Sequence, residues 1–120
     1  MTKLGDVCLV IFCTIVTSLG QLFWKIGAKS LPVIFTNWPL LIGFCFHIIA
    51  AFILIHSFKT GEVSVLFPMY ATNYVWVSLL AYHFLGESLN YLKISGMVVV
   101  IFGVIALSVG AHKHTQVVTP

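Results

Sequence analysis

Four long apolar stretches occupy almost the whole chain and leave little else to fold. They cover residues 4–28, 38–58, 63–85 and 91–111 of the 120 residues. A helix needs about 20 apolar residues to cross the hydrocarbon core of a bilayer, so each stretch is long enough for one span. The sequence therefore predicts an all-α membrane protein with a single domain, residues 1–120, built as a bundle of four transmembrane helices.

The composition excludes several classes of protein. Charged residues make up 8% of the chain, whereas soluble domains carry about a quarter. The basic residues are lysines that stand singly, so nothing indicates nucleic-acid binding. Cys8, Cys13 and Cys45 lie in apolar stretches, where we expect small buried side chains rather than disulfides or zinc ligands. The sequence contains no nucleotide-binding loop, catalytic triad or metal cluster, so we expect no enzyme, cofactor or metal.

Prolines and short polar segments mark the expected helix ends. Pro32 follows the first stretch, and Asn37-Trp38-Pro39 opens the second. Pro68 lies inside the third stretch, where neighbouring helices can satisfy the carbonyl that it frees. After the fourth stretch we expect residues 112–120 to form a disordered polar tail.

The lysines give almost no preference for one orientation in the membrane. One side collects Lys3, Lys59 and Lys113, and the other collects Lys25, Lys29 and Lys93. Because an excess of lysine normally sets the cytoplasmic side, this balance allows insertion in both orientations and pairing with an inverted copy. The alternative is a fixed orientation, set by a slight excess of lysine on the side of the termini.

A polar stripe follows one face of the first helix. Its members are Thr14, Ser18, Gln21 and Lys25, with Thr17 at the edge. Spacings of three and four residues put side chains on one face, and such groups in a membrane helix face a partner or a cavity. We expect the three hydroxyls to bond carbonyls of their own helix. Gln21 and Lys25 are the expected binding pair, and the alternative for Lys25 is to snorkel to the interface.

Polar side chains also lie near the centres of the second and third helices. Asn73 shares a face with Tyr70 and Val77, and it either bonds between helices or contacts a substrate. His47 is either a neutral ring bonded across helices or a proton site. Both residues therefore join the set of candidates for a polar cavity.

Small residues line one face of the fourth helix, at Gly96, Gly103 and Gly110. Such residues let membrane helices approach closely and associate. They serve either packing within one bundle or a contact between two chains. We prefer a dimer, because four helices provide little wall for a polar cavity.

These features resemble the small multidrug resistance family and the wider drug/metabolite transporter superfamily. The likeness rests on the four-helix length, on Phe84-Leu85-Gly86-Glu87 and on Gly96 with Gly103. It implies an antiparallel dimer that forms through the last helix. The multidrug members carry a membrane glutamate eight residues before the lysine of the first helix, and Thr17 stands there in this chain.

A closer similarity is to the subunits of the flippase for undecaprenyl-phosphate-linked aminoarabinose. It rests on Gly20-Gln21-Leu22 with Lys25, on Pro68-Met69 with residues 73–77, and on Glu87. It implies a flippase of the bacterial cytoplasmic (inner) membrane for a polyprenyl phosphate or its sugar conjugate. A lysine suits a phosphate, and an apolar groove suits an isoprenoid tail. The candidate substrate-binding residues are Thr17, Ser18, Gln21, Lys25, His47, Tyr70 and Asn73.

Two alternatives stay open. One is an exporter of small cationic or amphipathic solutes that uses His47 as its proton group. The other is a helper that docks onto a membrane glycosyltransferase through the glycines of the last helix. The partner chain is a second copy or, since the aminoarabinose system uses two different subunits, a paralogous subunit in a heterodimer.

Overall fold

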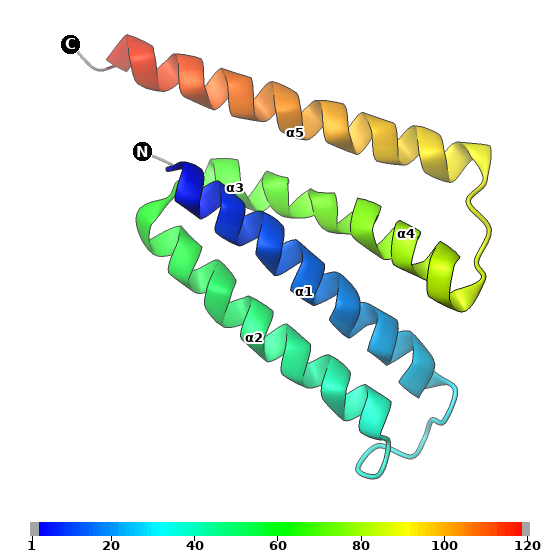
Figure 1. Ribbon diagram of the computed structural model, residues 1–120. Helices are drawn as coiled ribbons and strands as arrows, with labels where there is room; N and C mark the ends of the chain where they lie inside the picture. Colours follow the sequence, from blue (N-terminus) through cyan, green and yellow to red (C-terminus); the bar gives the residue numbers. More distant parts are fainter. Residues whose placement is uncertain (1–2, 119–120) are drawn as a thin grey trace.

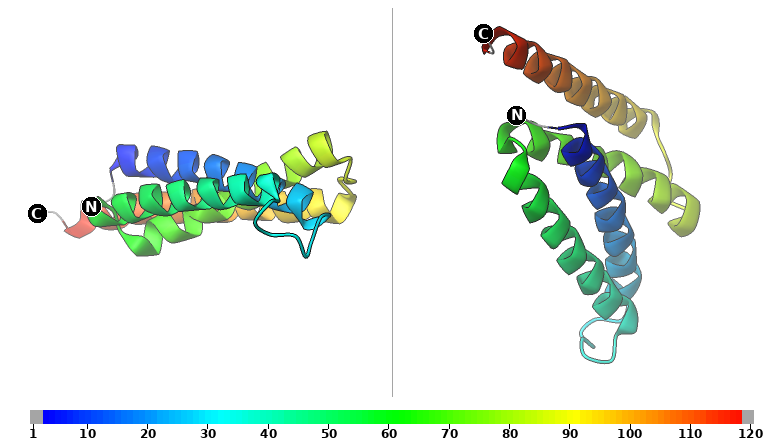
Figure 2. Two further views of the ribbon diagram at one scale, coloured as in Figure 1. Left: turned by 90° about the horizontal axis from the view of Figure 1, so that it is seen from below. Right: turned by 60° about the vertical axis from the view of Figure 1, so that its left-hand side comes forward.

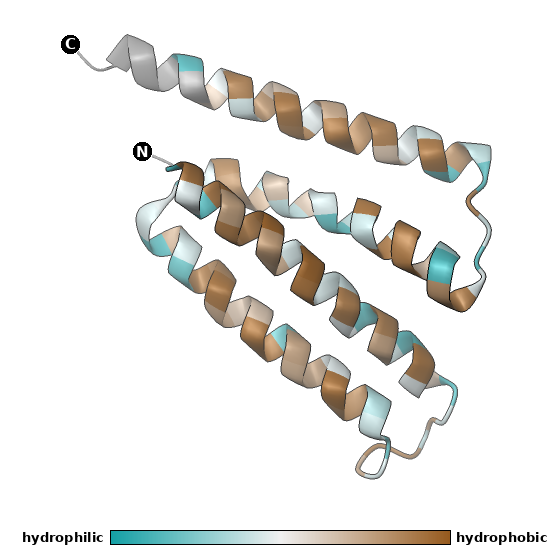
Figure 3. Ribbon diagram, viewed as in Figure 1, coloured by the Kyte–Doolittle hydropathy of each residue, from teal (hydrophilic) through white to brown (hydrophobic). Residues whose placement is uncertain are grey.

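The computed structural model describes residues 3–118, and the regular structure in that range is entirely helical. The elements are α1 (Leu4–Ala28), α2 (Trp38–Thr60), α3 (Val63–Met69), the 3₁₀ helix η1 (Tyr70–Thr72), α4 (Asn73–Leu85) and α5 (Tyr91–Val118). Four stretches are long and apolar enough to cross a membrane: Leu4–Ala28, Trp38–Thr60, Val63–Leu85 and Tyr91–Ala111. Apolar residues predominate along the visible faces of these helices (Figure 3), as is typical of helices that face lipid. The predicted fold class is confirmed.

The third and fourth stretches differ in detail from the sequence prediction. The third is interrupted by η1, which begins two residues after Pro68, and proline is a common cause of irregularity inside a helix. The last helix runs past Ala111 to Val118, so residues 112–118 are helical and the expectation of a disordered tail is wrong there. Adding a residue to an existing helix costs far less than nucleating one, which favours this extension. Residues 119 and 120 lie outside the described range.

Helix α1 lies between α2 on one side and α3 with α4 on the other (Figure 1). Val10 of α1 packs with Val65, Leu66 and Met69 of α3, and a second cluster joins α1 to α2. The helices form a thin slab with extents of 59 × 34 × 18 Å (Figure 2).

Glycines bring α1 and α2 into close contact. A Cβ on Gly20 would lie 2.6 Å from the His47 ring, and a Cβ on Gly43 would clash with the Trp24 ring. The Trp24 and His47 rings stack in parallel in the space that these glycines leave, with centroids 3.7 Å apart. The small-residue contact of this chain therefore joins the first two helices, a contact that the sequence reasoning missed.

A single asparagine fastens the two helix ends at the α1–α2 turn. The Asn37 side-chain amide donates to the Gly27 carbonyl oxygen at 2.7 Å, and its Oδ1 accepts from the Leu40 backbone N–H at 3.3 Å. The last turn of α1 and the first turn of α2 thus share one buried side chain. These bonds satisfy backbone groups that a helix end otherwise leaves unpaired.

A buried carboxylate joins the same two helices at the opposite end. Asp6 accepts the Thr60 hydroxyl at 2.6 Å and the Lys3 backbone N–H at 3.1 Å. These bonds connect the first turn of α1 to the last turn of α2. With contacts fixed at both ends, α1 and α2 form a well-anchored helical hairpin.

The cysteines do not share one environment. Cys13 is buried and donates its thiol to the Ala50 carbonyl oxygen at 3.1 Å, as expected of a small core residue. Cys8 and Cys45 are exposed on the outer surface, so the prediction of burial is wrong for both. Each lies on a helix face that has no neighbouring helix among the described residues to cover it.

Helix α5 stands apart from the other helices over much of its length (Figure 1). It contacts the core cluster of α3 through Val104 and Ala111. Among the described residues, nothing lies within 4 Å of a Cβ built on Gly96, Gly103 or Gly110. These glycines therefore do not serve packing within the bundle of one chain.

Candidate functional site

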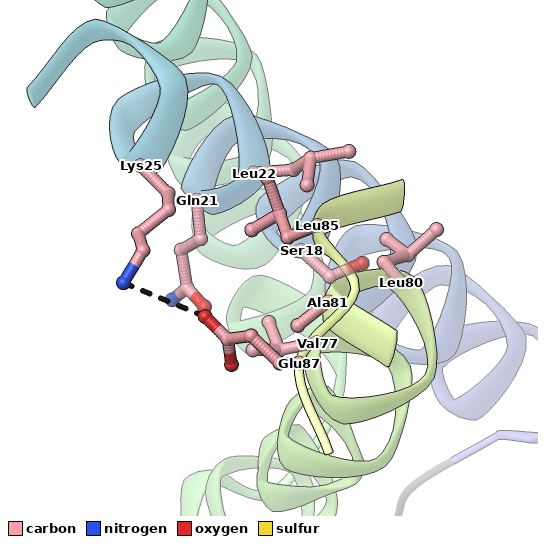
Figure 4. Close-up of a pocket in the computed structure, with 9 residues that line it drawn as sticks. All are labelled: Ser18, Gln21, Leu22, Lys25, Val77, Leu80, Ala81, Leu85 and Glu87. Carbon is pink, nitrogen blue, oxygen red and sulfur yellow. Dashed lines mark ion pairs between the residues drawn. The ribbon is translucent and has the colours of Figure 1, made fainter. Parts of the chain in front are cut away.

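A cavity of about 190 Å³ lies between α1 and α4, near the end of the bundle where α1 finishes. Figure 4 shows the side chains of both helices pointing into this space from opposite sides. The polar residues that line it are Ser18, Gln21, Lys25 and Glu87. Its apolar wall consists of Leu22, Val77, Leu80, Ala81 and Leu85. A charged rim and a hydrocarbon wall thus meet in one small space.

An ion pair crosses the mouth of the cavity. The Lys25 Nζ atom lies 3.4 Å from Glu87 Oε1, and the two side chains are 59% and 39% exposed (Figure 4). A pair this exposed contributes little to stability, about 0–1 kcal/mol. The Lys25 ammonium is therefore accessible from outside and only loosely held.

The turn at the C-terminal end of α4 positions the Glu87 carboxylate of this ion pair. Gly86 ends α4 with a φ of 67°, a left-handed conformation that glycine adopts without strain. The Glu87 backbone N–H then bonds the Ala81 carbonyl oxygen at 3.2 Å. This turn directs Glu87 back across the cavity toward α1.

A ladder of polar contacts continues from the cavity along α1. The Asn73 side-chain amide donates to Gln21 Oε1 at 3.5 Å, and the Tyr70 hydroxyl donates to Thr17 Oγ1 at 3.0 Å. One step further, the hydroxyl oxygens of Thr14 and Thr72 lie 3.4 Å apart. The polar stripe of α1 therefore faces the third membrane-spanning stretch and not lipid.

The hydroxyls of this stripe also bond their own helix, as predicted. Thr14 donates to the Ile11 carbonyl oxygen at 2.6 Å, Thr17 to Cys13 at 2.9 Å and Ser18 to Ile15 at 2.7 Å. Each hydroxyl hydrogen is thereby used. These oxygens can accept a further hydrogen bond, as Thr17 does from Tyr70, but they do not offer a free donor.

Asn73 is a buried polar residue beside the cavity. The residue is only 6% exposed, and its Oδ1 has no hydrogen-bond partner among the described residues. Within the described part of the chain, the hydrogen bond of its side chain to Gln21 is at the long limit of hydrogen-bond length. Asn73 and Gln21 therefore keep hydrogen-bonding capacity close to Lys25.

His47 lies away from this cavity. Its ring stacks on Trp24, and Nδ1 lies 2.8 Å from the Gly43 carbonyl oxygen of its own helix. Because a carbonyl oxygen can only accept, Nδ1 carries the proton in this contact. The expected bond across helices is replaced by a ring stack, and His47 is absent from the cavity lining.

The structure thus brings together part of the predicted site. Ser18, Gln21 and Lys25 line the cavity, Asn73 contacts Gln21, and Thr17 with Tyr70 forms the next step of the ladder. The sequence reasoning did not include Glu87 among the site residues, although it lies opposite Lys25. The signal for it was present, since glycine before an acid at a helix end predicts a turn that redirects the chain.

The described residues contain no group of three His, Cys, Asp or Glu side chains placed to hold a metal ion. A loosely paired ammonium, two amides and an apolar wall suit a ligand that joins an anion to hydrocarbon. The site is therefore described as a candidate amphiphile-binding site.

No family model matches this chain, and neither a curated protein nor a solved structure matches it. The resemblance to the small multidrug resistance family and to the aminoarabinose flippase subunits therefore stays a prediction from the sequence. The function has to be inferred from the cavity itself.

Proposed function

We propose that this protein is a flippase for a polyprenyl phosphate or a polyprenyl-phosphate-linked sugar. The observation that carries the proposal is the cavity between α1 and α4, where the Lys25 ammonium at the rim adjoins a wall of leucine, valine and alanine. Lysine binds phosphate as a compact point charge. The same space therefore suits both parts of a lipid phosphate.

The size of the cavity determines which part of the lipid it takes. Its volume of about 190 Å³ is below the roughly 300–1,000 Å³ of pockets that enclose a drug-sized ligand. A phosphate headgroup fits such a space, and the isoprenoid tail stays in the surrounding lipid. The Gln21 amide N–H groups add hydrogen bonds to the headgroup beside Lys25, and Asn73 positions Gln21 through its bond to Oε1.

The proposal includes a partner subunit, because one chain forms a slab of only 18 Å in its thinnest dimension. A second copy, antiparallel and in contact through α5, supplies the missing wall. A paralogous subunit in a heterodimer fills the same role. Alternating access of the headgroup site to the two leaflets then follows from rocking of one subunit against the other. The membrane of this activity is the bacterial cytoplasmic membrane.

Flipping of a labelled polyprenyl phosphate in proteoliposomes tests the function. Lys25→Ala should slow flipping about tenfold or more, because a hydrogen bond to a charged group contributes about 1.5–3 kcal/mol. Lys25→Glu should be at least as damaging, since it repels the phosphate. Lys25→Arg should keep part of the activity, because the charge stays while its geometry changes.

A matched control is Lys29→Ala, which removes an exposed lysine just after α1, outside the cavity lining and on the same side of the membrane as Lys25. It should flip lipid at the unmodified rate. An unmodified rate for a folded Lys25→Ala variant would reduce Lys25 to a snorkelling anchor. The exporter alternative predicts the reverse pattern, in which His47→Ala stops transport and Lys25→Ala does not.

A further inference from the structure

Glu87 already forms an ion pair with the Lys25 ammonium, the group on which the proposed function depends. Its Oε1 atom lies 3.4 Å from Lys25 Nζ, at the mouth of the cavity (Figure 4). An incoming anion therefore meets an ammonium that has a carboxylate beside it. Both charges are partly exposed, so this contact can open without leaving a buried charge behind.

The backbone at Glu87 is held by contacts that do not involve the Glu87 side chain. The left-handed turn at Gly86 and the bond from the Glu87 N–H to the Ala81 carbonyl oxygen fix the start of the loop. Further along, the Lys93 ammonium donates to the Ser88 carbonyl oxygen at 3.0 Å, and Asn90 Oδ1 accepts the Lys93 backbone N–H at 2.9 Å. The loop can thus keep its shape while the Glu87 side chain swings away from Lys25.

We propose that Glu87 is an exchangeable counter-ion, so that an anionic headgroup binds Lys25 by displacing the Glu87 carboxylate. The inference rests on the proposed function and assigns Glu87 a role in the exchange of anions at the same site. Glu87 lowers the affinity for every anion by the cost of breaking its own pair. It thereby excludes weakly held anions and keeps Lys25 paired in the empty state.

The inference predicts that removing the carboxylate strengthens binding. Glu87→Gln should lower the Kd for farnesyl phosphate about two- to fivefold, the equivalent of one partly exposed ion pair. Binding is measured by titration calorimetry on the full chain in nanodiscs of phosphatidylcholine, a lipid without net charge. Glu87→Ser tests the same loss with a smaller side chain and leaves the glycine turn at Gly86 intact.

Matched variants separate exchange from a general change of surface charge. Glu62→Gln removes an acid at the start of α3, on the other side of the bundle, and should leave the Kd unchanged. In a Lys25→Ala background, Glu87→Gln should lose most of its effect, because there is no ammonium to release. Inorganic phosphate should bind more weakly than farnesyl phosphate but with the same order among the variants.

Failure of the inference is distinguishable from failure of the proposed function. If Lys25→Ala weakens binding while folded Glu87→Gln and Glu87→Ser bind no tighter than the unmodified chain, exchange is overturned and Lys25 keeps its role. If Lys25→Ala binds farnesyl phosphate normally, the proposed function fails as well. If inorganic phosphate and farnesyl phosphate bind with equal affinity, counter-ion exchange stands, but the proposed recognition of a lipid is contradicted.

Discussion

At the scale of single residues, two glycines set how closely the first two helices approach. Gly20 and Gly43 face each other across the α1–α2 contact, and a Cβ on Gly43 would lie 2.9 Å from the Gly20 carbonyl oxygen. The absent side chains make room for the stack of Trp24 on His47. The rotation of α2 about its axis, and hence the face on which His47 lies, follows from this contact.

Gly43→Ala should destabilise the protein by about 1–3 kcal/mol, the usual cost of inserting a methyl group into a packed interface. The control is Gly5→Ala, since nothing lies within 4 Å of a Cβ at that position. The measurement is the thermal unfolding midpoint in detergent. Equal midpoints for the two variants would show that the α1–α2 contact yields easily and does not set the helix rotation.

Sequence reasoning reached the site residues that depend on helical periodicity alone. Ser18, Gln21 and Lys25 are found on one face because their spacing requires it. Glu87 was missed because its direction depends on the positive φ of Gly86 and not on any period. The position of His47 outside this cavity was not predictable for a different reason: a helix that is apolar all round carries no pattern that indicates which face meets its neighbour.

At the scale of elements, α5 is the helix with the least contact to the rest of the chain. Its apolar window from Tyr91 to Ala111 contributes nothing to the buried set. The sequence predicted its existence and start from hydropathy. Hydropathy could not predict the extension to Val118. For polar residues at a helix end, the helical and non-helical conformations differ little in local free energy. The break at η1 was foreseeable only in part, through Pro68.

Gly103→Leu should dissociate the proposed dimer while leaving the fold of one chain intact. The reason is that the added side chain meets open space within the chain but separates two helices that touch through small residues. Light scattering in detergent gives the mass, and circular dichroism gives the helix content. A dimer of unchanged mass would place the contact between subunits elsewhere.

At the scale of the whole molecule, polar contacts join the helices at both ends of the slab. Asp6 with Thr60 lies at one end, and Lys25 with Glu87 lies at the other. Lysines are also distributed almost evenly between the ends. Neither end is therefore marked as the one that must stay in the cytoplasm.

The unmodified chain should insert in both orientations. Two lysines added to the turn after Lys59 should fix one orientation, because the excess of positive charge then retains that end on the cytoplasmic side. Labelling of single cysteines from one side of the membrane, in a background free of the native cysteines, measures the distribution. Labelling from one side only in the unmodified chain would refute dual insertion.

The Asn37 bridge bears on how such a chain enters a bilayer. In half of the copies of a dually inserted chain, the tip of the α1–α2 hairpin must travel through hydrocarbon. An unsatisfied backbone group costs several kcal/mol there. The Asn37 side chain bonds the Gly27 carbonyl oxygen and the Leu40 backbone N–H, so these two groups at the tip stay hydrogen-bonded without water. The hairpin can then translocate as one preassembled unit, whichever way it faces.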